Sequence, residues 1–175
     1  EIGPNNGKKY SINEKIIIKK SILENIKIKK IDYKNSFNNI IRVLKGTNFD
    51  YFSKKAQTLF FNETYSVTKL VDRMGMRVDG PKLKNIVSTN IKSEGLVKGV
   101  IQVPADGYPI IVLSDHGTIG GYPKIAVVIS ADLDKVGQLT PGSKINFKEV
   151  NLEEAEDLFK NYNDETNKYL NEYNQ

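Results

Sequence analysis

The residues best suited to bind a small ligand lie between Thr118 and Lys124, in the segment TIGGYPK. Gly120 and Gly121 have no side chains, so their backbone N–H groups can come close to an oxyanion. Tyr122 supplies an aromatic wall with a hydroxyl group, and Lys124 supplies a positive charge. The segment predicts a site for a polar or anionic small molecule, with Lys124 and Tyr122 as the catalytic candidates. The structural alternative is a tight corner between two strands with an exposed lysine.

Three polar side chains elsewhere can complete this site. Gln102 carries an amide that can pair with a lactam or urea group, or that can instead satisfy neighbouring backbone. Arg73 and Arg77 flank Gly75, and guanidinium forks bind carboxylates and phosphates. The structural alternative for the two arginines is an ion pair with a nearby acid, which would be Asp72, Asp79 or Glu94.

His116 is the only histidine in the chain, and it follows Ser114 and Asp115. Along a strand, Ser114 and His116 would share one face while Asp115 points to the other, so a Ser–His–Asp triad is not predicted. We expect His116 to end a strand or to line the pocket and touch the substrate. One histidine and no cysteine do not make a typical zinc ligand set, so no metal site is predicted.

The segment from Gly137 to Lys144 has the glycine spacing of a phosphate-binding loop, but Ser143 and Lys144 stand in reversed order. A strand is predicted to follow it, so no helix N-terminus is available for phosphates. No ATP site is therefore predicted within this chain. Gly75 lies between two methionines where a biotin carrier needs a lysine, so biotin is not predicted to be attached there.

Short apolar runs rich in β-branched residues predict most of the structure that must position these groups. The expected strands are 26–29, 39–44, 63–68, 76–78, 84–88, 100–103, 110–113, 125–129 and 144–150, with a loop at 93–95. Many short strands with few helices predict a mostly β fold, either an antiparallel barrel or a sandwich.

Helical periodicity is confined to three segments. An aromatic stripe from Phe49 to Phe60 predicts a helix capped by Thr47 or Asn48, and residues 131–139 predict a short one. Residues 151–175 predict an amphipathic helix, because Asn151 and Glu154 have the spacing of a capping box and apolar residues follow at helical period. That helix either docks on its own barrel or binds a partner.

The chain has 175 residues, which suits one domain with a real core, and a formal net charge of +5. Lysines are spread along it without an arginine-rich or aromatic-interleaved block, so a solvated surface is favoured over specific nucleic-acid binding. No apolar run has the length of a membrane span or the form of a signal peptide. The absence of cysteine favours a reducing compartment, and we expect a cytoplasmic protein.

Five stretches together resemble the C-terminal half of a family that includes the C subunit of bacterial ATP-dependent 5-oxoprolinase. The family also includes the Kip antagonist protein, allophanate hydrolase subunit 2 and the carboxyltransferase domain of urea carboxylase. The stretches are NIIRV at 39–43, LVDRMGMRVDGP at 70–81, SEG at 93–95, QVPADGYPIIVLSDHGTIGGYPKIAVVISADL at 102–133 and QLTPGSKINF at 138–147.

The resemblance implies a cyclophilin-like barrel over residues 39–150, followed by the helix at 151–175. Residues 1–38 would be the remnant of a preceding domain, because family members are about twice as long as this chain. The implied activity is ATP-dependent opening of 5-oxoproline to glutamate, in a complex with subunits A and B that share the ATP.

Two alternatives within the family remain open. One is a carboxyltransferase of the urea carboxylase or allophanate hydrolase type, which would receive a carboxyl group from biotin held on another chain. The other is a non-catalytic regulatory protein of the Kip antagonist type, which would bind a Kip inhibitor-like barrel protein.

Overall fold

The computed structural model describes residues 11–15 and 38–174 of the chain, which divides into two units at residue 32. In the first unit, residues 11–15 form a turn in which the N–H of Glu14 donates to the carbonyl of Ser11 over 3.1 Å. The strand predicted at 26–29 and almost all of the lead-in 1–38 lie outside the described residues.

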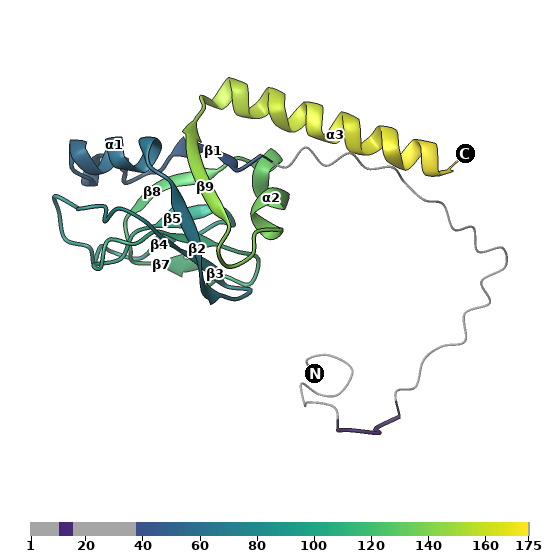
Figure 1. Cartoon of the computed structure of the whole chain (residues 1–175), viewed down its shortest axis with the longest axis horizontal. Helices are drawn as coiled ribbons and strands as arrows, with labels where there is room; N and C mark the ends of the chain where they lie inside the picture. The colour runs from purple at the N-terminus through teal and green to yellow at the C-terminus, as the bar shows by residue number, and fades with distance from the viewer. Residues whose placement is uncertain (1–10, 16–37, 175) are drawn as a thin grey trace. The chain divides into compact units, whose positions relative to one another are not determined.

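Seven strands of the second unit close a barrel (Figure 1). Around the barrel they follow the order β1, β8, β5, β6, β3, β2 and β9. Neighbouring strands are antiparallel except β1 and β9, which run parallel and close the barrel with Ile40 opposite Asn146. The strands are β1 (Ile40–Lys45), β2 (Tyr65–Val71), β3 (Gly75–Asp79), β5 (Val100–Gln102), β6 (Ile110–Val112), β8 (Lys124–Val128) and β9 (Lys144–Glu149). The mostly β barrel is confirmed.

The barrel interior is filled by side chains that point inward from alternate strand positions. Ile41, Ile101 and Ile111 are completely buried there. Helix α1 (Lys54–Asn62) packs on β9, and its Phe60 stacks on Phe147 with ring centroids 4.5 Å apart. This interior is therefore a packed core.

The aromatic stripe is buried as predicted, but its helix begins later. A separate 3-10 turn, η1 (Phe49–Tyr51), precedes α1, and the N-cap is Ser53, whose hydroxyl accepts a hydrogen bond from Ala56 N–H at 3.2 Å. Asn48 is not the cap of α1, because its side-chain oxygen accepts the backbone N–H of Lys124 at 3.0 Å. Asn48 thereby ties η1 to the start of β8.

A two-stranded ribbon, β4 (Glu94–Gly95) paired with β7 (Ile119–Gly120), lies outside the barrel sheet. Residues 94 and 95 of the loop predicted at 93–95 thus form a short strand. The strand predicted at 84–88 is wrong: this segment makes an isolated bridge between Phe52 and Asn85. Its apolar residues Ile86 and Val87 are exposed, so the run does not mark a buried strand.

After β8, the turn η2 (Ser130–Asp132) and helix α2 (Leu133–Gly137) place Asp132 in the interior with none of its surface exposed. Arg42 donates to it from the backbone at 2.8 Å and from the guanidinium at 2.5 and 2.9 Å. Lys135 adds an ion pair at 3.0 Å. Burial alone would raise the pKa of Asp132, but the hydrogen bonds from Arg42 and Lys135 outweigh burial and hold the pKa below its usual value.

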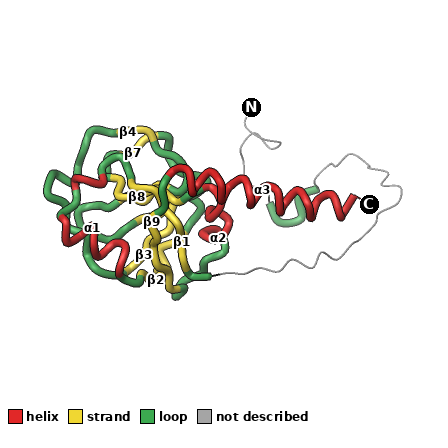
Figure 2. The backbone as a smooth tube through the Cα atoms, turned by 90° about the horizontal axis from the view of Figure 1, so that it is seen from above, coloured by secondary structure: helices red, strands yellow, loops and turns green. Residues whose placement is uncertain are grey.

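Helix α3 (Leu152–Asn174) ends the chain, and its N-terminus is capped as predicted, because Asn151 accepts a hydrogen bond from Glu154 N–H at 2.8 Å. Ala155 is buried and Leu158 partly buried against Ile129 and its neighbours. Farther along, the helix extends beyond the barrel (Figures 1 and 2). In the described part of the chain, no helix combines the length and apolarity needed to cross a membrane.

Two neighbouring substitutions in α3 test how it docks. Leu158→Asp places a charge in the contact with the barrel, so we expect it to lower the free energy of unfolding by about 1–3 kcal/mol. Phe159→Asp is the matched control, since Phe159 is 41% exposed and we expect little change in melting temperature. Equal melting temperatures for both variants would show that the barrel does not depend on this contact.

Candidate functional site

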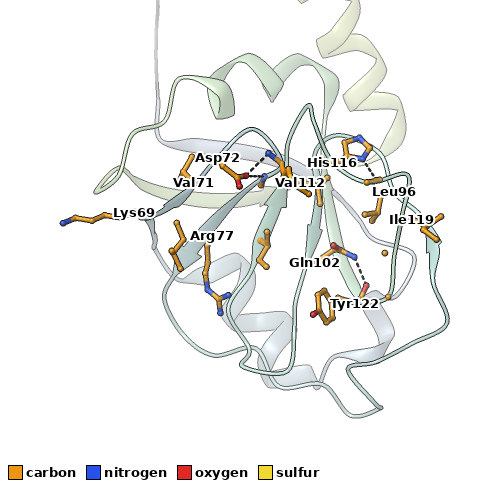
Figure 3. A pocket seen from close by; sticks show the side chains of 17 residues that line it. Lys69, Val71, Asp72, Arg77, Leu96, Gln102, Val112, His116, Ile119 and Tyr122 are labelled. Carbon is orange, nitrogen blue, oxygen red and sulfur yellow. Dashed lines mark hydrogen bonds between the residues drawn. The ribbon is translucent and has the colours of Figure 1, made fainter. Parts of the chain in front are cut away.

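A cavity of about 720 Å³ lies on the outer face of the barrel, beside Ile119 and Gly120 of the β4–β7 ribbon (Figure 3). Strand alternation places it there. Ile101 and Ile111 point into the core, so Gln102 and Ile110 beside them point outward into the cavity. Arg77 of β3 faces the same way. We call this space the main cavity.

One wall of the main cavity is apolar. Leu70 comes from the end of β2, Met74 from the β2–β3 connection and Ile119 from the ribbon, and all three are more than half exposed. The remaining apolar lining residues are Val71, Leu96, Ile110 and Val112. Sequence reasoning missed this wall, although one signal pointed to it: Ile110, Ile111 and Val112 make β6 apolar on both faces.

The polar end of the main cavity is built around Gln102, which is only 7% exposed. Its side-chain N–H donates to the carbonyl of Tyr122 at 3.3 Å (Figure 3). A Cβ at Gly120 would lie 2.8 Å from the same nitrogen, so a side chain there would displace the Gln102 amide from its present position. The amide oxygen of Gln102 accepts no hydrogen bond from the described residues and is available to a ligand N–H.

The structure brings most of the predicted site residues together, but not all. The main cavity is lined by Gln102, Arg77, His116, Gly120, Gly121 and Tyr122. Thr118, Arg73 and Lys124 are not among its lining residues. Thr118 is exposed, and its carbonyl instead accepts from Leu96 N–H at 3.0 Å within the ribbon.

Lys124 is the residue whose surroundings differ most from the prediction, which treated it as an exposed cation. It is 4% exposed, and its ammonium donates to the carboxylate of Glu94 at 2.6 Å. This bond lowers the pKa of Glu94 below its usual value, and Asn48 acts in the same direction. Lys124 is paired with Gln102 across β5 and β8, but it lines a second, smaller cavity together with Glu94 and Gly95 of β4.

The burial of Lys124 changes the result expected when it is removed. We expect Lys124→Met to lower the free energy of unfolding by about 1–2 kcal/mol, because Glu94 loses its partner and a packed side chain changes. Lys45→Met is the control, since Lys45 is half exposed and pairs with the similarly exposed Glu149. Denaturant unfolding of both variants measures the difference, and equal losses would argue against a structural role for the buried pair.

The two predicted arginines are held by acids other than those expected. Arg77 pairs with Asp106 and lies over the ring of Tyr108, and Arg73 pairs with Asp115 at 2.6 Å. The predicted pairing of these arginines with Asp72, Asp79 or Glu94 is wrong. Arg77 points away from the β2–β3 turn, and Glu94 forms its ion pair with Lys124. Their acid partners leave both guanidinium groups less available to an anion.

Proton-transfer groups in the main cavity are few. His116 is half buried, and its Nδ1 lies 2.7 Å from the carbonyl of Gly117. Asp72 accepts the backbone N–H groups of Met74 and Gly75, so it shapes the β2–β3 turn. The Tyr122 hydroxyl is also present, whereas Lys69 points away from the cavity (Figure 3). The described lining thus offers hydrogen-bonding groups beside an apolar wall, with few groups for proton transfer.

Comparison with known proteins identifies the family. The sequence model of the carboxyltransferase domain, subdomain A and B, matches residues 1–149. The chain belongs to this family. Two similar relatives are the 5-oxoprolinase C subunits of Escherichia coli (strain K12), 38% identical over 117 residues, and of Haemophilus influenzae, 39% identical over 119 residues. These alignments cover 67% and 68% of the chain, which spans only 38% of the length of either relative.

Solved structures in the same family confirm the fold. The crystal structure of the K. lactis urea amidolyase superposes with a TM-score of 0.72 at 30% sequence identity. The match covers 78% of this chain and 9% of that much longer protein. The chain therefore matches one part of that longer protein.

Proposed function

We propose that this chain is the lactam-binding part of a protein like the 5-oxoprolinase C subunits. The observation that carries the proposal is the side-chain amide of Gln102 at the polar end of a largely apolar cavity: its N–H donates to the carbonyl of Tyr122, and its oxygen is left open to a ligand. Identity of 38–39% to two 5-oxoprolinase C subunits supports the same substrate class.

5-Oxoproline fits the chemistry of the main cavity. Its ring is mostly hydrocarbon and suits the wall made by Leu70, Met74 and Ile119. Its N–H can donate to Gln102. The backbone N–H groups of Gly121 and Tyr122 donate to no acceptor in the described part of the chain, so they can bind an oxygen of the lactam or of its carboxylate.

ATP and the remaining catalytic groups would come from elsewhere in the assembly. The described lining of the main cavity offers no hydroxyl or thiol nucleophile paired with a base, and the sequence offers no phosphate-binding loop. We therefore place ATP on 5-oxoprolinase subunits A and B, and we expect this chain alone to turn over little 5-oxoproline.

A second candidate function is biotin-dependent carboxyl transfer to a small amide such as urea. The structural similarity to urea amidolyase favours it. The ureido ring of biotin, like a lactam, offers an N–H beside a carbonyl, so the Gln102 site suits both ligands. Biotin would then be carried by another chain or domain.

A comparison of ligands separates the two functions. We expect 5-oxoproline to shift the NMR signals of Gln102, Gly120 and Gly121, while N-methyl-5-oxoproline, which lacks the N–H, binds weakly. Added to subunits A and B, the protein that contains this chain should support 5-oxoproline-dependent ATP hydrolysis. Binding of biotinamide and urea without 5-oxoproline would favour the carboxyltransferase, and binding of none would reject the site.

A further inference from the structure

The second cavity has a volume of about 360 Å³ and is lined by β4 of the ribbon, whereas β7 lines the main cavity. Val97, Val100 and Val127 give it an apolar lining. Lys124 and Glu94 provide its charges, with Glu94 reaching in from β4. The cavity thus combines an apolar surface with one buried cation.

The ammonium of Lys124 is short of acceptors. It has three N–H donors, and within residues 11–15 and 38–174 its single acceptor is Glu94. The Lys124 side chain is 5% exposed, so water reaches it little. A buried ammonium without an anionic partner is costly, so some carboxylate must occupy this position.

Glu94 is held far less firmly than Lys124. Its side chain is 43% exposed, and its strand β4 is two residues long, exposed and outside the barrel sheet. Glu94 can therefore turn into water once another carboxylate has taken its place on Lys124, whereas Lys124 cannot leave its buried position. The Glu94 carboxylate accepts a hydrogen bond from the Lys124 ammonium at 2.6 Å, and this bond lowers the pKa of Glu94, so Glu94 already acts as a carboxylate ligand from within the chain.

We propose that the second cavity is a binding site for a small carboxylic acid, whose carboxylate replaces Glu94 on Lys124 and whose alkyl chain lies against the three valines. Release of Glu94 frees β4, and with it β7, which supplies Ile119 and Gly120 to the main cavity. Occupancy of the second cavity thereby alters the ribbon wall of the main cavity.

Propionate is the probe, and propionamide, its neutral isostere, is the control. In the NMR spectrum of the full chain at constant ionic strength, propionate should shift the signals of Gly46, Gly95 and Gly120, and propionamide should not. Glu94→Gln removes the internal competitor, so we expect it to bind propionate about tenfold more tightly than the natural chain. Lys124→Met should abolish the response.

Lys45→Met tests whether propionate binds through an exposed lysine instead of Lys124, because Lys45 lines the same cavity but is half exposed. It should respond to propionate like the natural chain. Should Lys124→Met fail to fold, Glu94→Gln still decides the question. Equal responses to propionate and propionamide, no gain in Glu94→Gln, or loss in Lys45→Met alone would overturn the proposal. Propionate has no lactam group, so these results are independent of the proposed function.

Discussion

Replacing Gln102 with leucine is expected to lower kcat/KM for 5-oxoproline about 100-fold in the assembled enzyme, or about 2.7 kcal/mol of transition-state stabilisation. Leucine has nearly the same size but cannot accept the lactam N–H. The carbonyl of Tyr122 also loses its hydrogen bond from the Gln102 side chain, and this loss loosens the polar end of the main cavity. Steady-state assays of lactam-dependent ATP hydrolysis measure the change.

Gln57→Leu is the matched control for this experiment. Gln57 is 8% exposed, and its amide donates to the backbone carbonyls of Phe49 and Phe52 at 3.1 Å, away from the main cavity. We expect it to lower the melting temperature without changing kcat/KM. If Gln102→Leu and Gln57→Leu behave alike, Gln102 is a structural residue and the proposed substrate contact is incorrect.

The largest loss of stability is expected for Asp132→Ala, about 3–5 kcal/mol, which corresponds to a melting temperature about 10 °C lower. The substitution leaves Arg42 and Lys135 as largely buried cations without their anion. Asp115→Ala is the control, because Asp115 forms a comparable but exposed pair with Arg73. Similar melting temperatures for these two variants would refute the special role of the buried carboxylate.

The lowered pKa of Asp132 determines how the stability of the folded chain depends on pH. The pKa of Asp132 is lower in the folded chain than in the unfolded one, so its contribution is present above the unfolded value, about pH 4, and is lost as pH falls through the folded value. The stability difference between the natural chain and Asp132→Asn should therefore narrow below about pH 4. Denaturant unfolding from pH 7 to pH 3 measures it. A difference that stays constant would mean that Asp132 does not titrate differently on folding.

The sequence predicted the barrel well where one strand face is buried and flanked by turns. β5, β6 and β8 lie within one residue of their expected starts, because their β-branched runs are bounded by Gly and Pro. The predictions failed where a local pattern competes with a distant contact. The side-chain oxygen of Asn48 accepts the backbone N–H of Lys124 at the start of β8 instead of capping α1, and Ser53 is the N-cap of α1.

The residue types of the candidate site could be predicted from the sequence. The division of these residues between two cavities could not. Gln102 and Lys124 lie opposite each other on adjacent strands, and the sequence carries no sign that their side chains line different cavities. Pairing of β4 with β7 joins residues 94 and 120, a contact too distant for local periodicity to reveal. That pairing brings Glu94 to Lys124 and buries the cation that was expected in the main cavity.

Closure of the barrel by β1 and β9 has a consequence for synthesis of the chain. Ile40 pairs with Asn146, 106 positions later, so the ribosome must add all of those residues before β1 finds its parallel neighbour. At about 5–20 residues per second this takes roughly 5–20 s. Until then one edge of β1 has free N–H and C=O groups, which another unfinished chain can pair with. Premature termination before β9 should therefore yield products that aggregate through this edge.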